Sequence, residues 1–433
     1  EISNNEYRQF VNWVRDSIAR RLLIAGGQEE DFGIAQEEFL SIWPVYTTDN
    51  NLQEPYVNWE PKVDWDSPDE EIRGILQPMY LPEGERFYNR KEIDTRKLNY
   101  EYYRIDIRLA ASKSNRFIPN KSPDIQDATH EYKKADYING VTLNDGQNGA
   151  AGSPASPVQD PSKDSKTLGT YNVKDQVSVG QGNYVPRERK GVDRSAFIIK
   201  DIINVYPDTL AWVHDFTYSF NEPLTNMYFW HPSYDDYPVV GITWKQARAF
   251  SVWRSNLLNN FLIGTGQSIV NDFRLPTESE WEYAARGGLE KSPYPWGGPY
   301  IRNSKGCFLG NFKPMRGSYV DDGGFHSLYI YSYNPNDYGL YCMSGNVSEW
   351  TSNAFDESAY DFQHDLNPDY VYEAQDKDAN VLKRKVIRGG SWKDVGYYLQ
   401  TSARTYEYQD TAKCYIGFRN VMTYLGRSKY DNF

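Results

Sequence analysis

Cysteine and histidine are scarce in this chain of 433 residues. Only Cys307, Cys342 and Cys414 occur, and no two of them form a Cys-x-x-Cys pair. Zinc ribbons and thioredoxin-like sites need such pairs, so the sequence disfavours both. The five histidines are scattered, with no pair at helical spacing, which disfavours a histidine-based metal site.

Long apolar runs and an excess of positive charge are also missing. No run approaches the roughly 20 apolar residues of a transmembrane helix. Lys and Arg (47) are outnumbered by Asp and Glu (59), which gives a formal net charge of -12 at pH 7. Sequence-independent nucleic-acid binding needs clustered basic residues, so we expect no nucleic-acid partner. The acidity is typical of a solvated surface, or of one that meets a partner with basic patches.

Aromatic residues are plentiful, with 36 Tyr, 12 Trp and 19 Phe, although only 39% of the chain is hydrophobic. Each Tyr or Trp ring carries a polar group that needs a hydrogen-bond partner when it is buried. This composition favours a loop-rich fold over a parallel sheet with a Val/Ile core. Since the chain starts at Glu1 with neither Met nor a signal peptide, we expect a mature or trimmed product.

Three capping boxes predict the starts of three helices, at Ser3–Glu6, Thr243–Gln246 and Thr277–Glu280. Apolar residues at helical spacing extend the first helix to about Leu23. Gly287 and Gly288 end the third. Between these helices, residues 44–132 show no sustained period. Residues 144–166 contain almost no large apolar side chains, so we expect a flexible loop there.

Four short motifs follow one another in the last third of the chain. They are Arg274-Leu-Pro-Thr-Glu-Ser-Glu-Trp-Glu-Tyr-Ala-Ala-Arg-Gly-Gly288, Gly345-Asn-Val-Ser-Glu-Trp350, Arg388-Gly-Gly-Ser-Trp392 and Gly417-Phe-Arg419. Together they resemble the formylglycine-generating-enzyme (sulfatase-modifying factor) domain. The resemblance implies an irregular, mixed α+β fold that is poor in regular secondary structure and similar to C-type lectins. Residues 1–43 would be its first part, 44–231 a large Tyr-rich insertion, and 232–433 its main body.

The catalytic residues of that family are missing from the positions that the resemblance assigns to them. Members that oxidise a sulfatase cysteine use two cysteines to bind copper, because soft thiolates select Cu(I). The resemblance places these two positions at Thr401 and Asn420. Cys414 lies nearby, but one thiolate cannot form the paired site. We therefore predict that the chain has no catalytic residues, binds no catalytic cofactor and is not an enzyme.

The family also binds structural calcium through loop oxygens, which are the ligands that this hard cation prefers. One such site would involve Asn311, Phe312, Asp321 and Asp322 beside a Gly-Gly turn, although a solvated acidic turn explains these residues equally well. A second site would use Gly345, Val347 and Glu349. There Cys342 stands where relatives often have Asp or Asn, and sulfur is a poor substitute for their oxygen.

Five residues of the motifs are expected to build the structural core. By resemblance, Arg388 and Arg419 would pair with Glu280 and Glu282 as buried charges, while Trp281 lies on the inward face of the third helix. Breaking one such pair leaves a buried charge uncompensated, so these residues would hold the fold rather than carry chemistry.

Within the family, the chain resembles the GldK/PorK group of gliding-motility and type IX secretion lipoproteins. The resemblance rests on residues 1–18, Gly310–Gly317 and Asp321–Phe325, and on the Tyr-rich insertion. It implies a periplasmic protein held at the outer membrane by a lipid on a cysteine outside this chain. It also implies a non-catalytic role, as a homo-oligomer in a ring with a GldN/PorN-type partner.

Aromatic residues at the end of the insertion are candidates for the partner surface. Aromatics are enriched at interface hot spots, and Tyr228, Trp230 and Tyr234 form the densest cluster. Ordinary core packing is the alternative for these three residues. Two other functions stay open for the whole chain. One is an oxygen-dependent oxidase with a non-standard ligand set, and the other is a glycan-binding module by analogy with C-type lectins.

Overall fold

The computed structural model describes residues 1–34, 56–86, 88, 90–112, 198–218, 222–315, 317–318, 320–321, 324–363 and 369–424. The chain forms two compact units. One comprises Glu1–Tyr100 and Ile203–Phe433, and the other comprises Glu101–Ile202. The predicted flexible loop at 144–166 lies outside the described residues.

Three helices of the first unit start at the predicted capping boxes. They are α1 (Asn4–Ala25), α12 (Trp244–Gly264) and α13 (Glu278–Arg286), and in each the cap hydroxyl and the acidic or amide side chain exchange hydrogen bonds with the backbone. The stop of α13 is confirmed as well, because Gly287 adopts the left-handed conformation with a φ of 58°. The capping signals therefore predicted these helix starts correctly.

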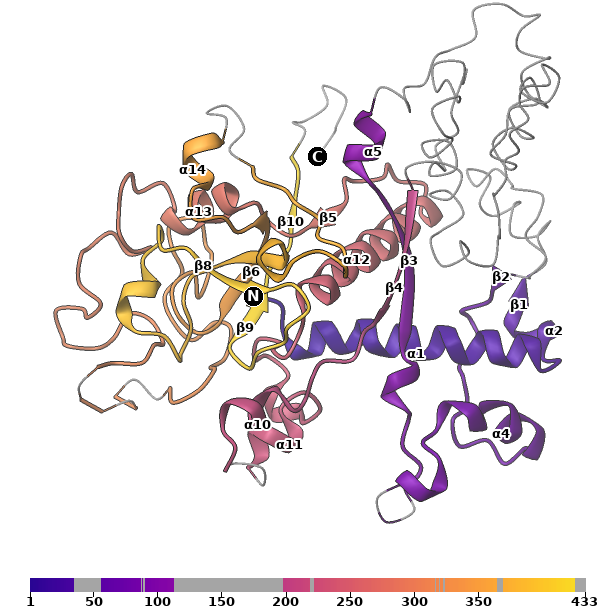
Figure 1. Ribbon diagram of the computed structural model, residues 1–433. Coiled ribbons are helices and arrows are strands. Elements are labelled where there is room, and N and C mark those ends of the chain that lie inside the picture. The colour runs from indigo at the N-terminus through magenta and orange to yellow at the C-terminus, as the bar shows by residue number, and fades with distance from the viewer. Residues whose placement is uncertain are drawn as a thin grey trace, which may run out of the picture. The chain divides into compact units, whose positions relative to one another are not determined.

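A four-stranded sheet forms the centre of the first unit (Figure 1). Its order is β8 (Thr405–Tyr408), β7 (Arg384–Arg388), β6 (Ser348–Ala354) and β9 (Ile416–Phe418). Only β6 and β9 run parallel. Six of the seven residues of β6 are buried, which is expected of an inner strand covered on both faces.

The remaining elements are short. In the first unit they are α2 (Glu29–Phe32), β1 (Gly33–Ile34), β2 (Tyr56–Val57), α4 (Glu70–Leu76), α10 (Ala211–Asp215), α11 (Pro223–Met227), β5 (Phe273–Arg274), α14 (Ala359–Phe362) and β10 (Val421–Met422). Two strands, β3 (Asn99–Ile105) and β4 (Ile198–Asn204), pair with each other, and α5 (Ile107–Ala111) follows β3. This mixture of helix and sheet is consistent with the α+β class.

Aromatic rings join α1, α12 and β9 in the core. Tyr7 stacks on Phe250 with ring centroids 5.5 Å apart, and it meets Phe418 edge-on. The Tyr7 hydroxyl donates to the Val205 carbonyl oxygen at 3.0 Å. The Tyr7 ring thus combines apolar packing with a satisfied hydroxyl, as the composition indicates.

Parts of the predicted insertion pack together with the predicted domain. Residues 56–100 and 203–231 belong to the same compact unit as residues 1–34 and 232–424. Phe10 of α1, for example, meets Tyr100 edge-on at 5.2 Å. The boundaries at 44 and 231 stay predictions. Among the helices of the described segments, none combines the length and apolar character needed to cross a bilayer.

The capping box of α13 can be tested by removing its hydroxyl. Thr277→Ala should lower the free energy of unfolding by about 1 kcal/mol, because the backbone N–H of Glu280 loses its acceptor. Ser358→Ala is the matched control, since Ser358 precedes α14 without making a side-chain cap. Urea unfolding measures both changes, and equal losses in the two variants would contradict the assignment.

Candidate functional site

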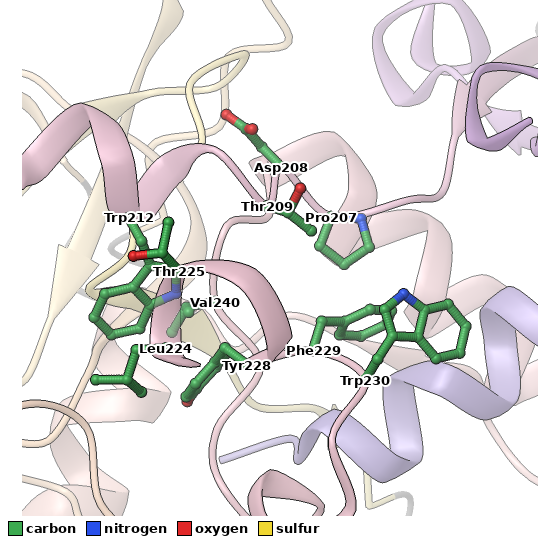
Figure 2. Close-up of a pocket in the computed structure, with 10 residues that line it drawn as sticks. All are labelled: Pro207, Asp208, Thr209, Trp212, Leu224, Thr225, Tyr228, Phe229, Trp230 and Val240. Atoms are coloured by element: carbon green, nitrogen blue, oxygen red, sulfur yellow. The ribbon is translucent and has the colours of Figure 1, made fainter. Parts of the chain in front are cut away.

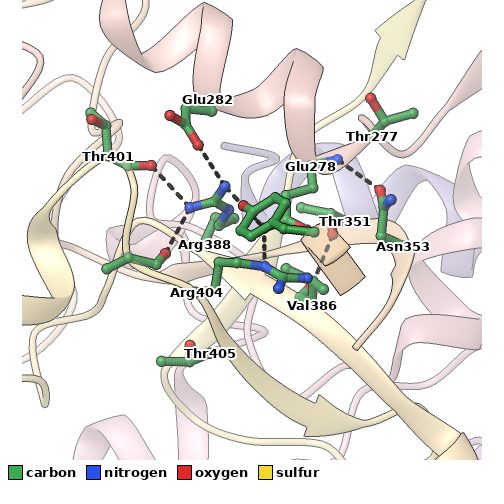
Figure 3. Close-up of polar contacts among 12 residues, drawn as sticks. Thr277, Glu278, Glu282, Thr351, Asn353, Val386, Arg388, Thr401, Arg404 and Thr405 are labelled. Carbon is green, nitrogen blue, oxygen red and sulfur yellow. Dashed lines mark hydrogen bonds and ion pairs between the residues drawn. The ribbon is translucent and has the colours of Figure 1, made fainter. Parts of the chain in front are cut away.

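Thr401, one of the two positions assigned to the family's cysteines, is fully buried. Its hydroxyl donates to the Ser292 carbonyl oxygen at 3.1 Å. Its own carbonyl oxygen accepts a hydrogen bond from Arg388 Nη1 at 3.0 Å (Figure 3). Among the described residues, this hydroxyl bonds only to the backbone carbonyl oxygens of Ser292 and Pro293, so the side chain holds that segment in place.

Asn420, the other position, lies beside α12. Its Oδ1 accepts a hydrogen bond from Ser251 Oγ at 2.9 Å, while its Nδ2 has no partner among the described residues. The two positions therefore hold a hydroxyl and an amide that bond to different segments of the chain. Neither supplies the soft ligand that copper chemistry requires.

All three cysteines are free, and the two buried ones bond to different groups. The Cys414 thiol donates to Asp215 Oδ2 at 2.9 Å, and the Cys342 thiol donates to the Ile330 carbonyl oxygen at 3.4 Å. Burial raises the pKa of both thiols far above the usual range. Both thiols are therefore protonated hydrogen-bond donors in the interior, and they bond to different parts of the chain. Cys307 is a single exposed thiol.

Arg388 of β7 is the centre of a buried charge network (Figure 3). Its Nη2 lies 2.7 Å from Glu282 Oε2 and 3.0 Å from Glu278 Oε1, both on α13. Arg404 Nε binds the same Glu278 oxygen. The Arg388 side chain is 1% exposed and that of Glu278 is 4% exposed, so solvent does not screen this pair.

A second buried pair joins β6 to the residue that follows β9. Both Glu349 oxygens accept hydrogen bonds from the Arg419 guanidinium, and Oε2 also accepts one from Trp281 Nε1 at 2.6 Å. Burial by itself would raise the pKa of Glu349, but the charge and hydrogen bonds of Arg419 outweigh it and lower that pKa. Glu349 is therefore a buried carboxylate that is held ionised.

The structure places Glu282, Arg388, Arg419 and Trp281 in the ion pairs and hydrogen bonds around α13 and the sheet, whereas Glu280 lies outside them. Glu280 is 44% exposed and forms a bidentate pair with Arg274, while its carboxylate also completes the capping box. The buried acids are instead Glu278 and Glu349. The i,i+4 spacing of Glu278 and Glu282 puts both on one face of α13, and this spacing was a usable signal for Glu278.

The ligands predicted for the first calcium site differ in burial and in their partners. Asn311 is buried and its Nδ2 donates to the His326 carbonyl oxygen, whereas Asp321 lies at the surface, 3.3 Å from Arg302. Asp322 lies outside the described residues. Phe312 meets Phe308 edge-on, with ring centroids 5.0 Å apart.

At the second predicted calcium site, Gly345 and Val347 precede β6, and the Glu349 carboxylate is already neutralised by Arg419. This arrangement does not favour a further cation. Within the described residues, no three His, Cys, Asp or Glu side chains come together as metal ligands. Calcium binding through backbone and amide oxygens stays a prediction at both places.

Of the three aromatic residues predicted for a partner surface, only Trp230 is exposed, with 44% of its surface accessible. Tyr228 is buried, and its hydroxyl donates to the Pro238 carbonyl oxygen at 2.6 Å and accepts from Ser327 Oγ at 3.0 Å. Tyr234 is half-buried and packs against Tyr228. The assignment of Tyr228 to a partner surface is therefore corrected, because it is a core residue.

His326, which the sequence analysis did not select, is enclosed by aromatic rings. It meets Trp212, Phe216, Phe325 and Trp392 edge-on, at centroid distances of 4.7–5.6 Å. Its Nδ1 is buried and has no hydrogen-bond partner among the described residues. Burial lowers the pKa of His326, and the negative charge of Glu222 only partly opposes this effect. The imidazole is thus a neutral packing group.

Comparison with known proteins places these features in a family context. The profile of the "Sulfatase-modifying factor enzyme 1-like domain" family matches residues 170–424. The chain is 34% identical to "Inactive C-alpha-formylglycine-generating enzyme 2" of Bos taurus, over 42% of this chain and 50% of that relative. It is 30% identical to "Formylglycine-generating enzyme" of Thermomonospora curvata, over 42% of this chain and 55% of that relative.

The solved structure of PvdO from Pseudomonas aeruginosa is 22% identical in sequence to this chain. The match covers 43% of this chain and 62% of the PvdO chain, with a TM-score of 0.34. The chain spans about half the length of the curated relatives it matches.

The buried network can be tested against an exposed ion pair. Arg388→Ala should lower the free energy of unfolding by about 3 kcal/mol, because Glu278 keeps only Arg404 as a buried cationic partner and the carbonyl oxygens of Thr401 and Ala403 lose their donor. Arg274→Ala removes an Arg–Glu pair of similar geometry at the surface and should cost about 1 kcal/mol or less. Urea unfolding compares the two, and an Arg388 variant as stable as the Arg274 variant would refute the structural role.

His326 predicts a pH dependence of stability. The pKa of His326 is lower in the folded protein than in the unfolded chain. The unfolded chain therefore takes up a proton first as the pH falls. Stability should be full above the ordinary histidine pKa of about 6.5 and should decline as the pH falls below it. Urea midpoints at about pH 8 and pH 5.5 would measure this. His326→Phe should reduce the decline, whereas the control His214→Gln, at an exposed position, should leave it unchanged.

Proposed function

This chain belongs to the sulfatase-modifying factor enzyme 1-like (formylglycine-generating-enzyme) domain family, and we propose that it uses this fold as a non-catalytic structural component. More specifically, we propose a role in the type IX protein secretion and gliding-motility machinery. There it would form a periplasmic ring with a GldN/PorN-type partner, and a lipid anchor outside this chain would hold it at the outer membrane.

One observation carries the non-catalytic part of the proposal, namely the chemistry at Thr401. Its buried hydroxyl donates to a backbone carbonyl oxygen, and its backbone is held by Arg388. A hydroxyl of this kind cannot take the place of a copper-binding thiolate. The two buried cysteines do not form a pair in its place, because their thiols donate to different groups, Asp215 and the Ile330 carbonyl oxygen.

The relatives do not decide between activity and inactivity by themselves, because one matched relative is named as inactive and another as a formylglycine-generating enzyme. The residues of this chain therefore carry more weight than the similarity. The fold-supporting residues Trp281, Glu349, Arg388 and Arg419 are all engaged in buried contacts. The framework is retained, while the paired thiols are absent from the positions that the family resemblance assigns to them.

The secretion role rests on the resemblance of residues 1–18, Gly310–Gly317 and Asp321–Phe325 to the GldK/PorK group. Exposed aromatic side chains add physical support, because a ring component needs contact surfaces and aromatics are enriched in them. Tyr283, Tyr300 and Tyr397 are each more than 60% exposed on the first unit.

Oxygen consumption and assembly size test the proposal together. With copper and a cysteine-containing sulfatase peptide, the purified chain should consume no oxygen above the buffer rate, because it has no thiolate pair. A formylglycine-generating enzyme assayed in parallel is the positive control. Mixed with a GldN/PorN-type protein, the chain should form a complex much larger than either component, as measured by light scattering.

The two readouts separate the parts of the proposal. Oxygen consumption in proportion to the amount of this chain would refute the non-catalytic role and support an oxidase with a non-standard site. A mixture that scatters as two separate proteins would refute the ring role while leaving the non-catalytic role intact.

A further inference from the structure

The pocket between α10, α11 and the segment that leads to Trp230 is too small to be a ligand site (Figure 2). It encloses room for about one water molecule, so no organic ligand or side chain fits inside. Both signs of charge lie at its walls, since Arg8 binds the Trp230 carbonyl oxygen and Lys393 pairs with Asp215. The pocket is therefore a packing gap between aromatic side chains.

Two exposed tyrosines meet elsewhere on the surface of the first unit. Tyr283 lies on α13 and is 68% exposed, while Tyr338 follows the turn at Asn336 and is 45% exposed. The Tyr338 hydroxyl donates to the Tyr283 hydroxyl at 3.0 Å. Their ring centroids are 5.7 Å apart, and the ring planes are tilted by 43°. Both phenols are thus open to solvent and in direct contact with each other.

The backbone that carries this pair is held in place by one buried amide. Asn336 Nδ2 donates to the carbonyl oxygens of Ala284 and Ala285 at the end of α13. Asn336 Oδ1 accepts hydrogen bonds from the backbone N–H groups of Tyr338 and Leu340. The amide therefore fixes the turn against the helix, and it fixes the spacing of the two rings with it.

Two phenols held in contact can be joined by one-electron oxidation. Each phenol loses one electron and one proton, which gives two tyrosyl radicals, and the exposed hydroxyls release the protons to water. Coupling forms one carbon–carbon bond between ring carbons ortho to the two hydroxyls. The hydrogen on each of these carbons then moves to the ring oxygen, which restores both phenols.

The fixed backbone favours coupling within the pair over coupling between chains. Groups that are tethered in contact react at an effective concentration on the order of millimolar or more, far above that of a dilute protein solution. The hydrogen bond between the hydroxyls already brings the two rings together before oxidation. Little rearrangement is then needed for the radicals to meet.

We propose that Tyr283 and Tyr338 are a site of oxidative cross-linking, at which a haem peroxidase that consumes hydrogen peroxide converts the pair to dityrosine. The peroxide takes up the two electrons and two protons that the phenols release, and it is reduced to water. The new bond ties α13 to the turn at Asn336 and closes the intervening chain into a loop. The reaction needs no ring partner, so it is independent of the proposed function.

Limited oxidation of the purified chain tests this site. The chain is treated with one equivalent of hydrogen peroxide and a haem peroxidase, and the monomer is digested and analysed by mass spectrometry. The main intrachain product should join the peptides of Tyr283 and Tyr338 and should lack two hydrogens. Its yield per chain should not fall on dilution, because the reaction is intramolecular. A main product that joins other tyrosines, or no intrachain product, would overturn the proposal.

Matched variants remove one phenol at a time. Tyr338→Phe should remove most of the intrachain dityrosine fluorescence, because phenylalanine forms no phenoxyl radical. Tyr331→Phe is the control, since Tyr331 is 54% exposed and meets Tyr329 at a centroid distance of 5.4 Å, with no hydrogen bond between these two described hydroxyls. This control should keep the yield of the unaltered chain. Circular dichroism establishes that both variants fold, and equal dityrosine yields from the two would overturn the proposal.

The cross-link should also stabilise the folded chain. A covalent bond between residues 283 and 338 restricts the unfolded chain, as a disulfide does. The oxidised monomer should therefore melt at a higher temperature than the untreated chain, whereas Tyr338→Phe treated in the same way should show no upward shift. An oxidised monomer that melts like the untreated chain would overturn the claim that the bond ties the turn to α13.

Discussion

The fold depends on buried charges that are joined through one helix. Glu349 and Arg388 lie directly opposite each other on β6 and β7, so their side chains share one face of the sheet. Helix α13 binds both, since Trp281 donates to Glu349 while Glu278 and Glu282 bind Arg388. An unpaired charge in such a place costs several kcal/mol. Each partner therefore holds the others in position, and the sheet, α13 and the loops that carry Arg404 and Arg419 are stabilised together.

This constraint holds the framework independently of the side chain that stands at Thr401. Arg388 also binds the carbonyl oxygens of Thr401 and Ala403, so the segment that contains the assigned cysteine position is held through its backbone. Replacing a thiol by a hydroxyl at Thr401 leaves those bonds intact. The side chain that would do chemistry and the contacts that hold its segment are thus separable. A chain can lose the first and keep the second, which is consistent with an inactive relative of similar sequence.

Local signals in the sequence were sufficient for some features and not for others. Each capping box spans only four residues, and each of the three helices starts where its box predicts. Glu280 was assigned wrongly because the motif points to a charged pair without saying which acid is inward, and its own capping role already directs it to the surface. The burial of Tyr228 could not be predicted, because its partner Ser327 lies 99 residues away. Long-range packing of aromatic loops leaves no period in the sequence.

Long-range aromatic packing also affects how rigid the surface of this loop-rich fold is. A fold with short strands and many loops usually lacks rigid surfaces, because loops move more than the elements they connect. Here aromatic packing supplies the rigidity, as when Trp212 stacks on Trp392 and also contacts His326. The indole of Trp230 is fixed by Tyr206 although much of it faces solvent. Exposed aromatic surface that is already ordered favours binding, since little entropy remains to be lost. The aromatic residues of the chain therefore order its interior and some of its exposed side chains by the same physical means.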